Sequence, residues 1–426
     1  MEDMRPVSVA ARFSGVREAT QLLVAGLGVE DMVIQSMPDV SPTKWHLAHT
    51  TWFWETFLLR SQLAGYREYS GEFNYLFNSY YNGIGARHAR SERGLLSRPT
   101  LTDVMAYRAH VDEAMSRLLM LDHIAENTAI QDLVELGLAH EQQHQELILT
   151  DIKHVLSRHP FAPAAFATPT DPGTTADDGP CGWVEFDGGV VETGTDGGRF
   201  HFDNEGPKHQ SILTPFALAD RLVSNRDYRA FIEDGGYRTA GLWLSDGWAK
   251  VQAQGWAAPL YWRDGDGGPE IFTLHGQQPL DLDAPVVHLS YYEASAFAEW
   301  SGARLPDERE WEVGASTRRS VDGRFCSPGR SAHPGATPMH RSAGAGLRQV
   351  FGDAWEWTRS AYSPYPRYRP APGAVGEYNG KFMCGQFVLR GGSCATQPGH
   401  VRPSYRNFFP PEARWQFSGL RLAKDI

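Results

Sequence analysis

Apolar residues in the first 160 positions recur at intervals of three and four, the spacing that places them on one face of an α-helix. Ser41 and Pro42 mark the start of the second such stretch, because serine caps helix N-termini and proline fits the first helical position. Residues 62–98 lack this period, so we expect a long ordered loop there, of a kind that often carries function. The pattern predicts helices over residues 14–27, 42–61, 100–121 and 128–157.

This pattern ends after residue 157. Residues 158–182 are rich in proline, alanine, threonine and glycine, which predicts a linker. Beyond the linker, turns are frequent, strands look short, and two helices are expected, capped by Ser224 and Ser290. The predicted fold class is therefore α+β with two domains, a helical bundle over residues 1–157 and an irregular α+β domain over residues 183–426.

Length and composition agree with two packed domains. The chain has 426 residues, more than one ordinary core, and its hydrophobic content is 41% with 13 tryptophans. The net charge of -11 argues against a general nucleic-acid binder. We expect a cytoplasmic protein without a membrane span, because there is no secretory h-region, no 18-residue apolar run and no C-x-x-C among the four cysteines.

Candidate chemistry lies in the run AHEQQHQELIL. His140 and His144 are one helical turn apart and share the apolar stripe of their helix with Leu136 and Leu147. Two neutral imidazoles that face a protein interior are costly unless they are bound, and a divalent metal is a common solution. Hydrogen-bonded core histidines are the alternative.

The same run matches H-E-x-x-H, the motif of zinc proteases, so a metal-dependent hydrolase is one hypothesis. The downstream ligand of such enzymes is missing, and we therefore look for a third ligand upstream. There His49 lies between Trp45 and Trp52 on one stripe of the second helix, while His46 lies about 60 degrees away and is not excluded. Three histidines suit catalytic zinc, whereas non-haem iron more often has two histidines and a carboxylate. Three neutral ligands leave the metal charge uncompensated, which favours an anionic substrate group such as a thiolate.

Two groups of motifs resemble known families. The runs GARLPDEREWEVGA, GDAWEWTRSAY and VLRGGSCATQPGHVRPSYRNFF resemble formylglycine-generating enzymes and sulfatase-modifying factors, a variant of the C-type lectin fold. WHLAHTTWF and HEQQHQE resemble the metal-binding helices of DinB-like bundles. The two in this order resemble the EgtB family, the sulfoxide synthases of ergothioneine biosynthesis.

The resemblance implies an enzyme that depends on iron(II) and O2. It would couple the sulfur of cysteine, or of γ-glutamylcysteine, to the imidazole of Nα-trimethylhistidine (hercynine) and leave a sulfoxide. The metal ligands of the family correspond to His49, His140 and His144, which decides against His46. Gln143 would bind the substrate imidazole.

Residues of the long loop also receive roles from this resemblance. Tyr80 or Tyr81 would donate a proton or hydrogen atom during carbon–sulfur coupling, although some relatives carry this tyrosine in the C-terminal domain. Arginines suit carboxylates, so the loop arginines are candidates to bind the carboxylate of the thiol substrate. These candidates are Arg87, Arg90 and Arg93. Arg90 and Arg93 resemble the basic pair of the branch that uses free cysteine.

The C-terminal domain would hold the trimethylammonium end of hercynine. The candidates are Asn407, Phe408 and Phe409, since aromatic faces suit a quaternary ammonium. By match to the family motif, Asn407 and the aromatic after it would reach the amino-acid end of hercynine. Trp415 and Phe417 are expected to be core. On this interpretation the active site lies in a cleft between the domains.

Other functions remain as alternatives. A formylglycine-generating enzyme would need a second cysteine after Cys394, which the sequence lacks. An ovothiol-type synthase would use histidine, and we expect it to carry a further methyltransferase domain. A lectin-like binding protein would have a closed metal site. The sequence leaves undecided the thiol, the acting tyrosine, the oligomeric state and whether the C-terminal domain binds calcium.

Overall fold

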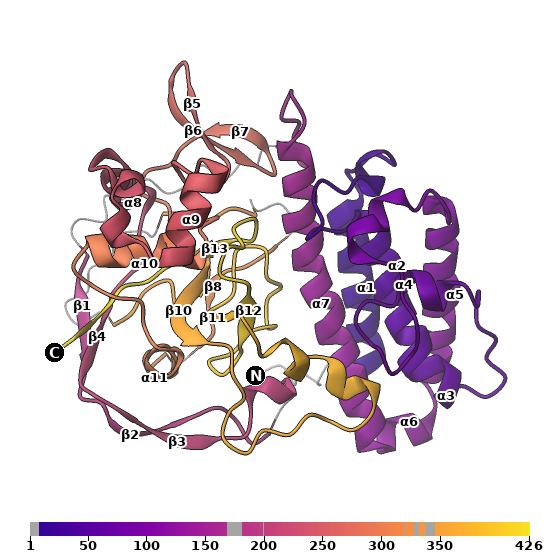
Figure 1. The fold of residues 1–426 in the computed structure, drawn as a ribbon. Coiled ribbons are helices and arrows are strands. Elements are labelled where there is room, and N and C mark those ends of the chain that lie inside the picture. The colour runs from indigo at the N-terminus through magenta and orange to yellow at the C-terminus, as the bar shows by residue number, and fades with distance from the viewer. Residues whose placement is uncertain (1–7, 168–180, 199, 319, 328–331, 337–345) are drawn as a thin grey trace, which may run out of the picture. The chain divides into compact units, whose positions relative to one another are not determined.

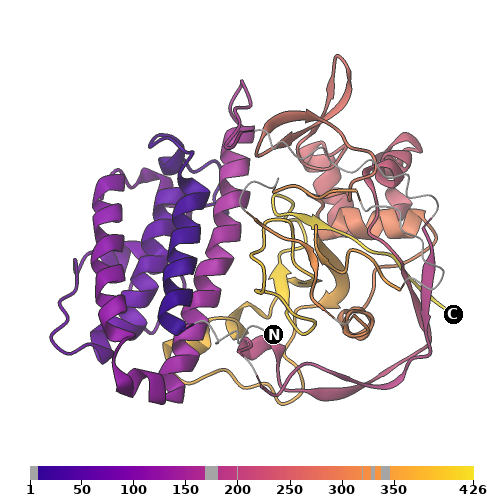
Figure 2. The same cartoon turned by 180° about the vertical axis from the view of Figure 1, so that it is seen from behind.

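The computed structural model describes residues 8–167, 181–198, 200–318, 320–327, 332–336 and 346–426. The chain forms two compact units (Figures 1 and 2). Unit 1 is Met1–Pro160 together with Ala371–Tyr378, and unit 2 is Phe161–Pro370 together with Asn379–Ile426. Residues 168–180 of the predicted linker lie outside the described residues, so the domain boundaries proposed from the sequence stay a prediction.

Unit 1 is a bundle of long helices in which α2 contacts both α5 and α7, and α1 contacts α7. The four predicted helices are all present, with ends that differ by a few residues. The longest, α7, has the predicted bounds, and α2 runs into a π-helical turn, η2. The helices are α1 Val9–Val24, α2 Thr43–Trp54, η2 Glu55–Leu59, α3 Arg60–Gln62, α4 Phe73–Phe77, α5 Leu101–Leu118, α6 Asp122–Glu126 and α7 Thr128–Ser157.

The predicted start of α2 was wrong by one residue. Pro42 is the N-cap, and its carbonyl accepts the first backbone hydrogen bonds, from Trp45 and His46. Ser41 does not cap the helix, because its backbone N–H donates to Asp151 and its hydroxyl accepts from an arginine of the loop. Every residue of α2 is buried, so this helix has no solvent-exposed face.

The predicted loop between α3 and α5 contains short ordered elements. α4 is one, and the 3-10 turn η3, Arg90–Leu95, is another. A further 3-10 turn of unit 1, η7 at Ala374–Glu377, comes from far along the chain. Residues 371–378, here called the strap, pack with the bundle although they follow it by more than 200 positions.

Unit 2 consists of small sheets and short helices. A four-stranded sheet has the order β12-β11-β10-β13, and a three-stranded antiparallel sheet has the order β1-β4-β14. The strands are β1 Trp183–Phe186, β2 Gly189–Thr193, β3 His209–Leu213, β4 Phe216–Ala219, β5 Trp262–Gly265, β6 Gly268–Thr273, β7 Gly276–Pro279, β8 Gly323–Arg324, β9 Phe351–Gly352, β10 Trp355–Ala361, β11 Phe387–Arg390, β12 Asn407–Phe409, β13 Ser418–Gly419 and β14 Ala423–Asp425.

Both predicted helices of unit 2 are confirmed. α8, Asn225–Glu233, and α10, Tyr291–Trp300, begin at Ser224 and Ser290, each of which forms a capping box with the acidic residue three positions on. Two further helices were not predicted, α9 at Ser245–Gln254 and α11 at Glu308–Ser316. Trp415 and Phe417 are buried, as expected for core residues.

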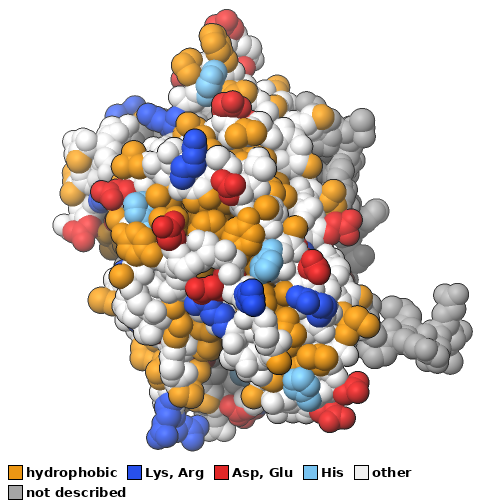
Figure 3. All heavy atoms as spheres, turned by 90° about the vertical axis from the view of Figure 1, so that its right-hand side faces the viewer, with side chains coloured by type: hydrophobic (Ala, Val, Ile, Leu, Met, Phe, Trp, Pro, Cys, Tyr) orange, Lys and Arg blue, Asp and Glu red, His pale blue; other side chains and the backbone are white. Residues whose placement is uncertain are grey.

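The surface is mixed in character. Figure 3 shows the face on which α3 and α5 lie in Figure 1, where charged side chains of both signs are scattered between apolar ones. In the described part of the chain, none of the helices combines the length and apolar character that a membrane span requires.

Candidate metal centre

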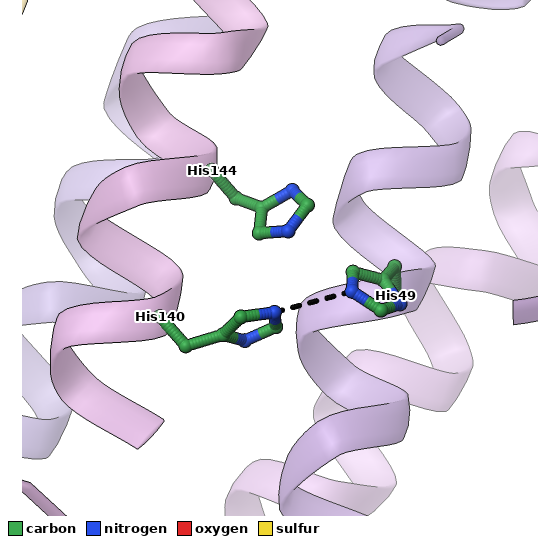
Figure 4. A group of neighbouring side chains, drawn as sticks. All are labelled: His49, His140 and His144. Carbon is green, nitrogen blue, oxygen red and sulfur yellow. Dashed lines mark hydrogen bonds between the residues drawn. The ribbon is translucent and has the colours of Figure 1, made fainter. Parts of the chain in front are cut away.

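Three histidine side chains of unit 1 converge on one point (Figure 4). α2 contributes His49, and α7 contributes His140 and His144. One ring nitrogen of each residue lies within 4.8 Å of those of the other two, and Nε2 of His49 is 3.1 Å from Nε2 of His140. All three side chains are buried. Three nitrogen donors at this spacing can share one metal ion.

The orientation of His49 is set by its surroundings. Its Nδ1 is 2.6 Å from the backbone oxygen of Phe77, and since a carbonyl only accepts, Nδ1 carries the hydrogen. Nε2 therefore presents its lone pair to the other histidines. The ring is stacked between Trp45 and Trp52, at centroid distances of 4.5 and 5.5 Å. His49 thus has one tautomer and little freedom to rotate.

His46 is not part of this group. It is buried, like every residue of α2, so burial alone could not have separated it from His49. Its Nδ1 instead lies 2.9 Å from Nδ1 of His144, on the side of that ring away from Nε2. Its Nε2 lies 3.0 Å from Oδ2 of Asp151.

The histidines are neutral at neutral pH. Burial lowers the pKa of His140 to about 3. Burial lowers the pKa of His49 and His144 well below its ordinary value, and the neighbouring histidines lower it further. A neutral imidazole has a free lone pair and can coordinate a cation. The donor set therefore fits a metal with N-ligand preference, and it adds no negative charge of its own.

Glu141 does not belong to the centre. Its carboxylate accepts hydrogen bonds from Arg17, Arg108 and the Trp54 indole. These cations outweigh the effect of burial and hold the pKa of Glu141 at about 2. The glutamate of the H-E-x-x-H run is therefore part of a buried ion-pair network of the bundle, which argues against a metalloprotease general base.

The strap brings a tyrosine to the centre. The hydroxyl of Tyr378 donates to Oε1 of Gln143, and its ring centroid lies 5.9 Å from that of His140. Glu377 holds the strap on the loop, because its two carboxylate oxygens accept from the backbone N–H groups of Asn82, at 2.9 Å, and Gly83, at 2.6 Å. Gln143 thus bonds a tyrosine that lies near His140, a partner that was not predicted.

The two loop tyrosines differ in position. The ring of Tyr80 lies 6.1 Å from that of Tyr378, which makes the two phenols neighbours beside the histidines. Tyr81 is fully buried and packs on Trp52 and Phe57. Burial raises the pKa of both tyrosines, so each keeps its phenolic hydrogen at neutral pH.

The three loop arginines also differ. Arg87 and Arg90 are exposed, and they donate to the side chain of Asn82 and to the backbone of Asp39. Arg93 is buried, with its guanidinium 3.3 Å from the centroid of the Trp45 ring. It donates to the hydroxyls of two serines but forms no ion pair within the described ranges. Burial lowers its pKa well below the ordinary value.

Asn407, Phe408 and Phe409 form strand β12 of unit 2. The side chain of Asn407 accepts from the backbone N–H of Phe408 at 2.9 Å, and the Phe408 ring stacks on Tyr362 at 4.1 Å. All three side chains are half-buried. Their substrate-binding role, and the cleft between domains, stay predictions.

Tyr378 and Glu377 are the site residues that sequence reasoning missed. They lie in the run APGAVGEYNG, which has no helical or strand period to place its side chains. The one available signal was the resemblance itself, since some relatives carry the acting tyrosine in the C-terminal domain.

Family models match both parts of the chain. Residues 12–148 match the DinB superfamily, and residues 170–426 match the sulfatase-modifying factor enzyme 1-like domain. This is the order that the motifs implied, and the predicted fold class of a DinB-like bundle followed by a domain of this type is confirmed.

Curated relatives match nearly the whole chain. The hercynine oxygenase of Mycobacterium tuberculosis is 32% identical over 458 aligned positions, covering 99% of each chain. That of Mycolicibacterium smegmatis is 33% identical and covers 92% of this chain and 93% of its own. The formylglycine-generating enzyme of Thermomonospora curvata is 28% identical over 57% of this chain.

Proposed function

We propose that this chain, which belongs to the hercynine oxygenase family, is an O2-dependent sulfoxide synthase that acts on hercynine and a cysteine-type thiol. The thiol gives up its S–H hydrogen and the imidazole gives up one C–H hydrogen as the carbon–sulfur bond forms. One atom of O2 becomes the sulfoxide oxygen and the other leaves as water, so the reaction needs no further reductant.

The observation that carries the proposal is the convergence of three buried, neutral histidines beside a glutamine and a phenol. His49, His140 and His144 would hold an iron(II) ion. Such an ion would supply the one-electron chemistry that O2 activation requires. The three ligands carry no charge, which leaves the ion attractive to a thiolate.

The residues around the histidines would orient the substrates and supply a proton. Gln143 bonds Tyr378 and follows His140 by three positions on α7, and its amide would bind the hercynine imidazole. The phenols of Tyr378 and Tyr80 lie next to each other and keep their hydrogens, so either can deliver a proton or hydrogen atom to the reacting oxygen. The ring of Tyr81 packs against the ring of Tyr80, with centroids 4.6 Å apart, and would support it.

Arg93 is the strongest of the arginine candidates for the thiol's carboxylate. A buried guanidinium that forms no ion pair within the described ranges is costly, and an incoming carboxylate would compensate it. Arg87 and Arg90 are exposed, and they would attract the negatively charged thiol substrate from a longer distance. Whether the donor is cysteine or γ-glutamylcysteine decides how many carboxylates these arginines meet.

The test measures O2 consumption by the iron-loaded chain with hercynine or histidine and with cysteine or γ-glutamylcysteine, in all four combinations. We expect about one iron per chain and uptake that requires hercynine and a thiol together, with a sulfoxide as product. His140→Ala should abolish iron binding. Uptake with histidine in place of hercynine would move the protein to the ovothiol-type reaction, and absence of uptake in every combination would refute the proposal.

A further inference from the structure

The fourth buried histidine of the bundle, His46, has no role in the function proposed above. His46 lies beside His144 but directs neither nitrogen at the point where the three candidate ligands meet. Its two ring nitrogens are both engaged, one by His144 at 2.9 Å and one by Asp151 at 3.0 Å. A carboxylate, an imidazole and a candidate metal ligand therefore stand in one chain of hydrogen bonds.

The direction of these hydrogen bonds follows from the groups. The carboxylate of Asp151 accepts the backbone N–H of Ser41 at 2.8 Å, and it also accepts from Nε2 of His46. A neutral imidazole has one N–H, so Nδ1 of His46 is left as an acceptor. Nδ1 of His144 must then donate to it. This leaves the lone pair of His144 on Nε2, the nitrogen that faces His49 and His140.

We propose that Asp151 and His46 form a relay that sets the tautomer and ring orientation of His144, and that His46 is a positioning residue for the metal. This inference rests on the proposed function in one respect, the presence of a metal at the three histidines. Metal-bound histidines usually donate their other N–H to a carboxylate or carbonyl, which fixes the ring and strengthens it as a donor. Here an imidazole stands between the ligand and the carboxylate.

The three candidate ligands are supported unequally. His49 donates to the Phe77 carbonyl, and His144 donates into the relay. Nδ1 of His140 has no hydrogen-bond partner among the described residues. Asp151 also ties the chain just before α2 to α7, because it accepts from the backbone N–H of Ser41.

The test is a cobalt(II) titration of the metal-free, full-length chain, followed by the visible absorption of the ion. His46→Phe keeps a ring of similar size but removes the acceptor, and we expect cobalt affinity to fall about 10–100-fold with a changed absorption band. His46→Asn places an amide oxygen near the position of Nδ1, and we expect it to recover part of the affinity. His154→Phe is the matched control, because His154 is another histidine of unit 1, on α7 like His144 and Asp151, but it bonds Ser36 and not the relay.

The outcomes separate the relay from the metal site. If His46→Phe binds cobalt as tightly as the unchanged chain and His154→Phe, the relay is refuted while the metal site stands. If the unchanged chain binds no cobalt, the proposed function fails and the relay with it. Should His46→Phe not fold, His46→Gln replaces it, since its amide reaches the position of Nε2 instead. Equal affinity of the Gln and Asn variants would then overturn the inference.

Discussion

Gly137 on α7 packs directly against the ring of Trp54 on α2, with no room for a side chain. A Cβ placed there would lie 2.5 to 3.0 Å from three ring atoms of Trp54. The same indole donates to Glu141, which anchors it to α7 one turn further on. The ring therefore cannot move aside without losing a buried hydrogen bond. His140 follows Gly137 by three positions, so this close contact between α2 and α7 lies one helical turn from a candidate metal ligand.

Gly137→Ala is expected to destabilise the metal-free chain by about 1–3 kcal/mol, because overpacking in a filled core forces side chains or helices apart. Gly15→Ala is the matched control, since the added carbon would have no neighbour within 4 Å on α1. We expect that variant to be neutral or slightly more stable. Urea unfolding measures both. Equal stability of the two variants would show that the Trp54 contact is loose.

At the scale of single residues, the sequence predicted that His140 and His144 lie together but left open which histidine of α2 joins them. His140 and His144 were predictable because helical spacing alone brings them to one face. The choice between His46 and His49 was not decidable from periodicity, because α2 is buried all round and has no exposed side to exclude one of them. What separates them is the direction of each ring, which depends on Phe77 and Asp151.

The strap is an element whose position depends on one carboxylate. Glu377 binds the backbone N–H groups of Asn82 and Gly83 and thereby holds Tyr378 beside Gln143. The residues joined by this contact are about 295 positions apart in the chain. Local pattern and propensity carry no information over such a distance. The sequence therefore predicted an ordered loop over residues 62–98 but not the segment that binds to it.

Glu377→Gln should loosen the strap, because a neutral amide offers one acceptor where the carboxylate offers two charged ones. We expect amide hydrogen exchange at Asn82 and Gly83 to become at least ~10-fold faster, as for a loss of about 1.4 kcal/mol. In turnover, less sulfoxide should form relative to cysteine sulfinate, since Tyr378 would be held less firmly. Glu92→Gln, an exposed carboxylate of the same loop, is the control. Unchanged exchange in Glu377→Gln would mean that other contacts hold the strap.

Over the whole molecule, buried histidines link folding to pH. Burial lowers the pKa of His140 and His400 to about 3 and that of His154 to about 4, against 6.5 when exposed. The unfolded chain therefore binds more protons below pH 6.5, and stability is lost as the pH falls through this window. Asp353 acts in the opposite sense between pH 6 and 3.8, because burial raises its pKa to about 6. Burial also raises the pKa of Glu312 and Glu356. Among the described residues these three carboxylates are outnumbered by six histidines whose pKa burial lowers, namely His46, His49, His140, His144, His154 and His400.

We expect the metal-free chain to lose stability steadily between pH 7 and pH 5, with a slope of about 1.4 kcal/mol per pH unit for each histidine that titrates only on unfolding. His400 lies in unit 2 and is remote from the candidate ligands in the sequence. We expect His400→Phe to make this slope shallower by about 1.4 kcal/mol per pH unit, the contribution of one proton. Urea unfolding at several pH values measures it. A slope that His400→Phe leaves unchanged would mean that this side chain is reached by protons in the folded state.

The order of the two domain types was predictable at this scale, because each type carries several motifs and the family models fall on the same residues. The path of the chain between the two units was not predictable from the sequence. A segment from within the second domain type belongs by its contacts to the bundle, and no composition shift marks residues 371–378.

The stacking of His49 between Trp45 and Trp52 gives the centre an optical reporter of its own. An open-shell ion bound to that imidazole would lie within a few ångströms of two indoles and quench their emission, whereas a closed-shell ion such as zinc would leave it nearly unchanged. The fluorescence of the unlabelled protein would thus distinguish one occupant from another.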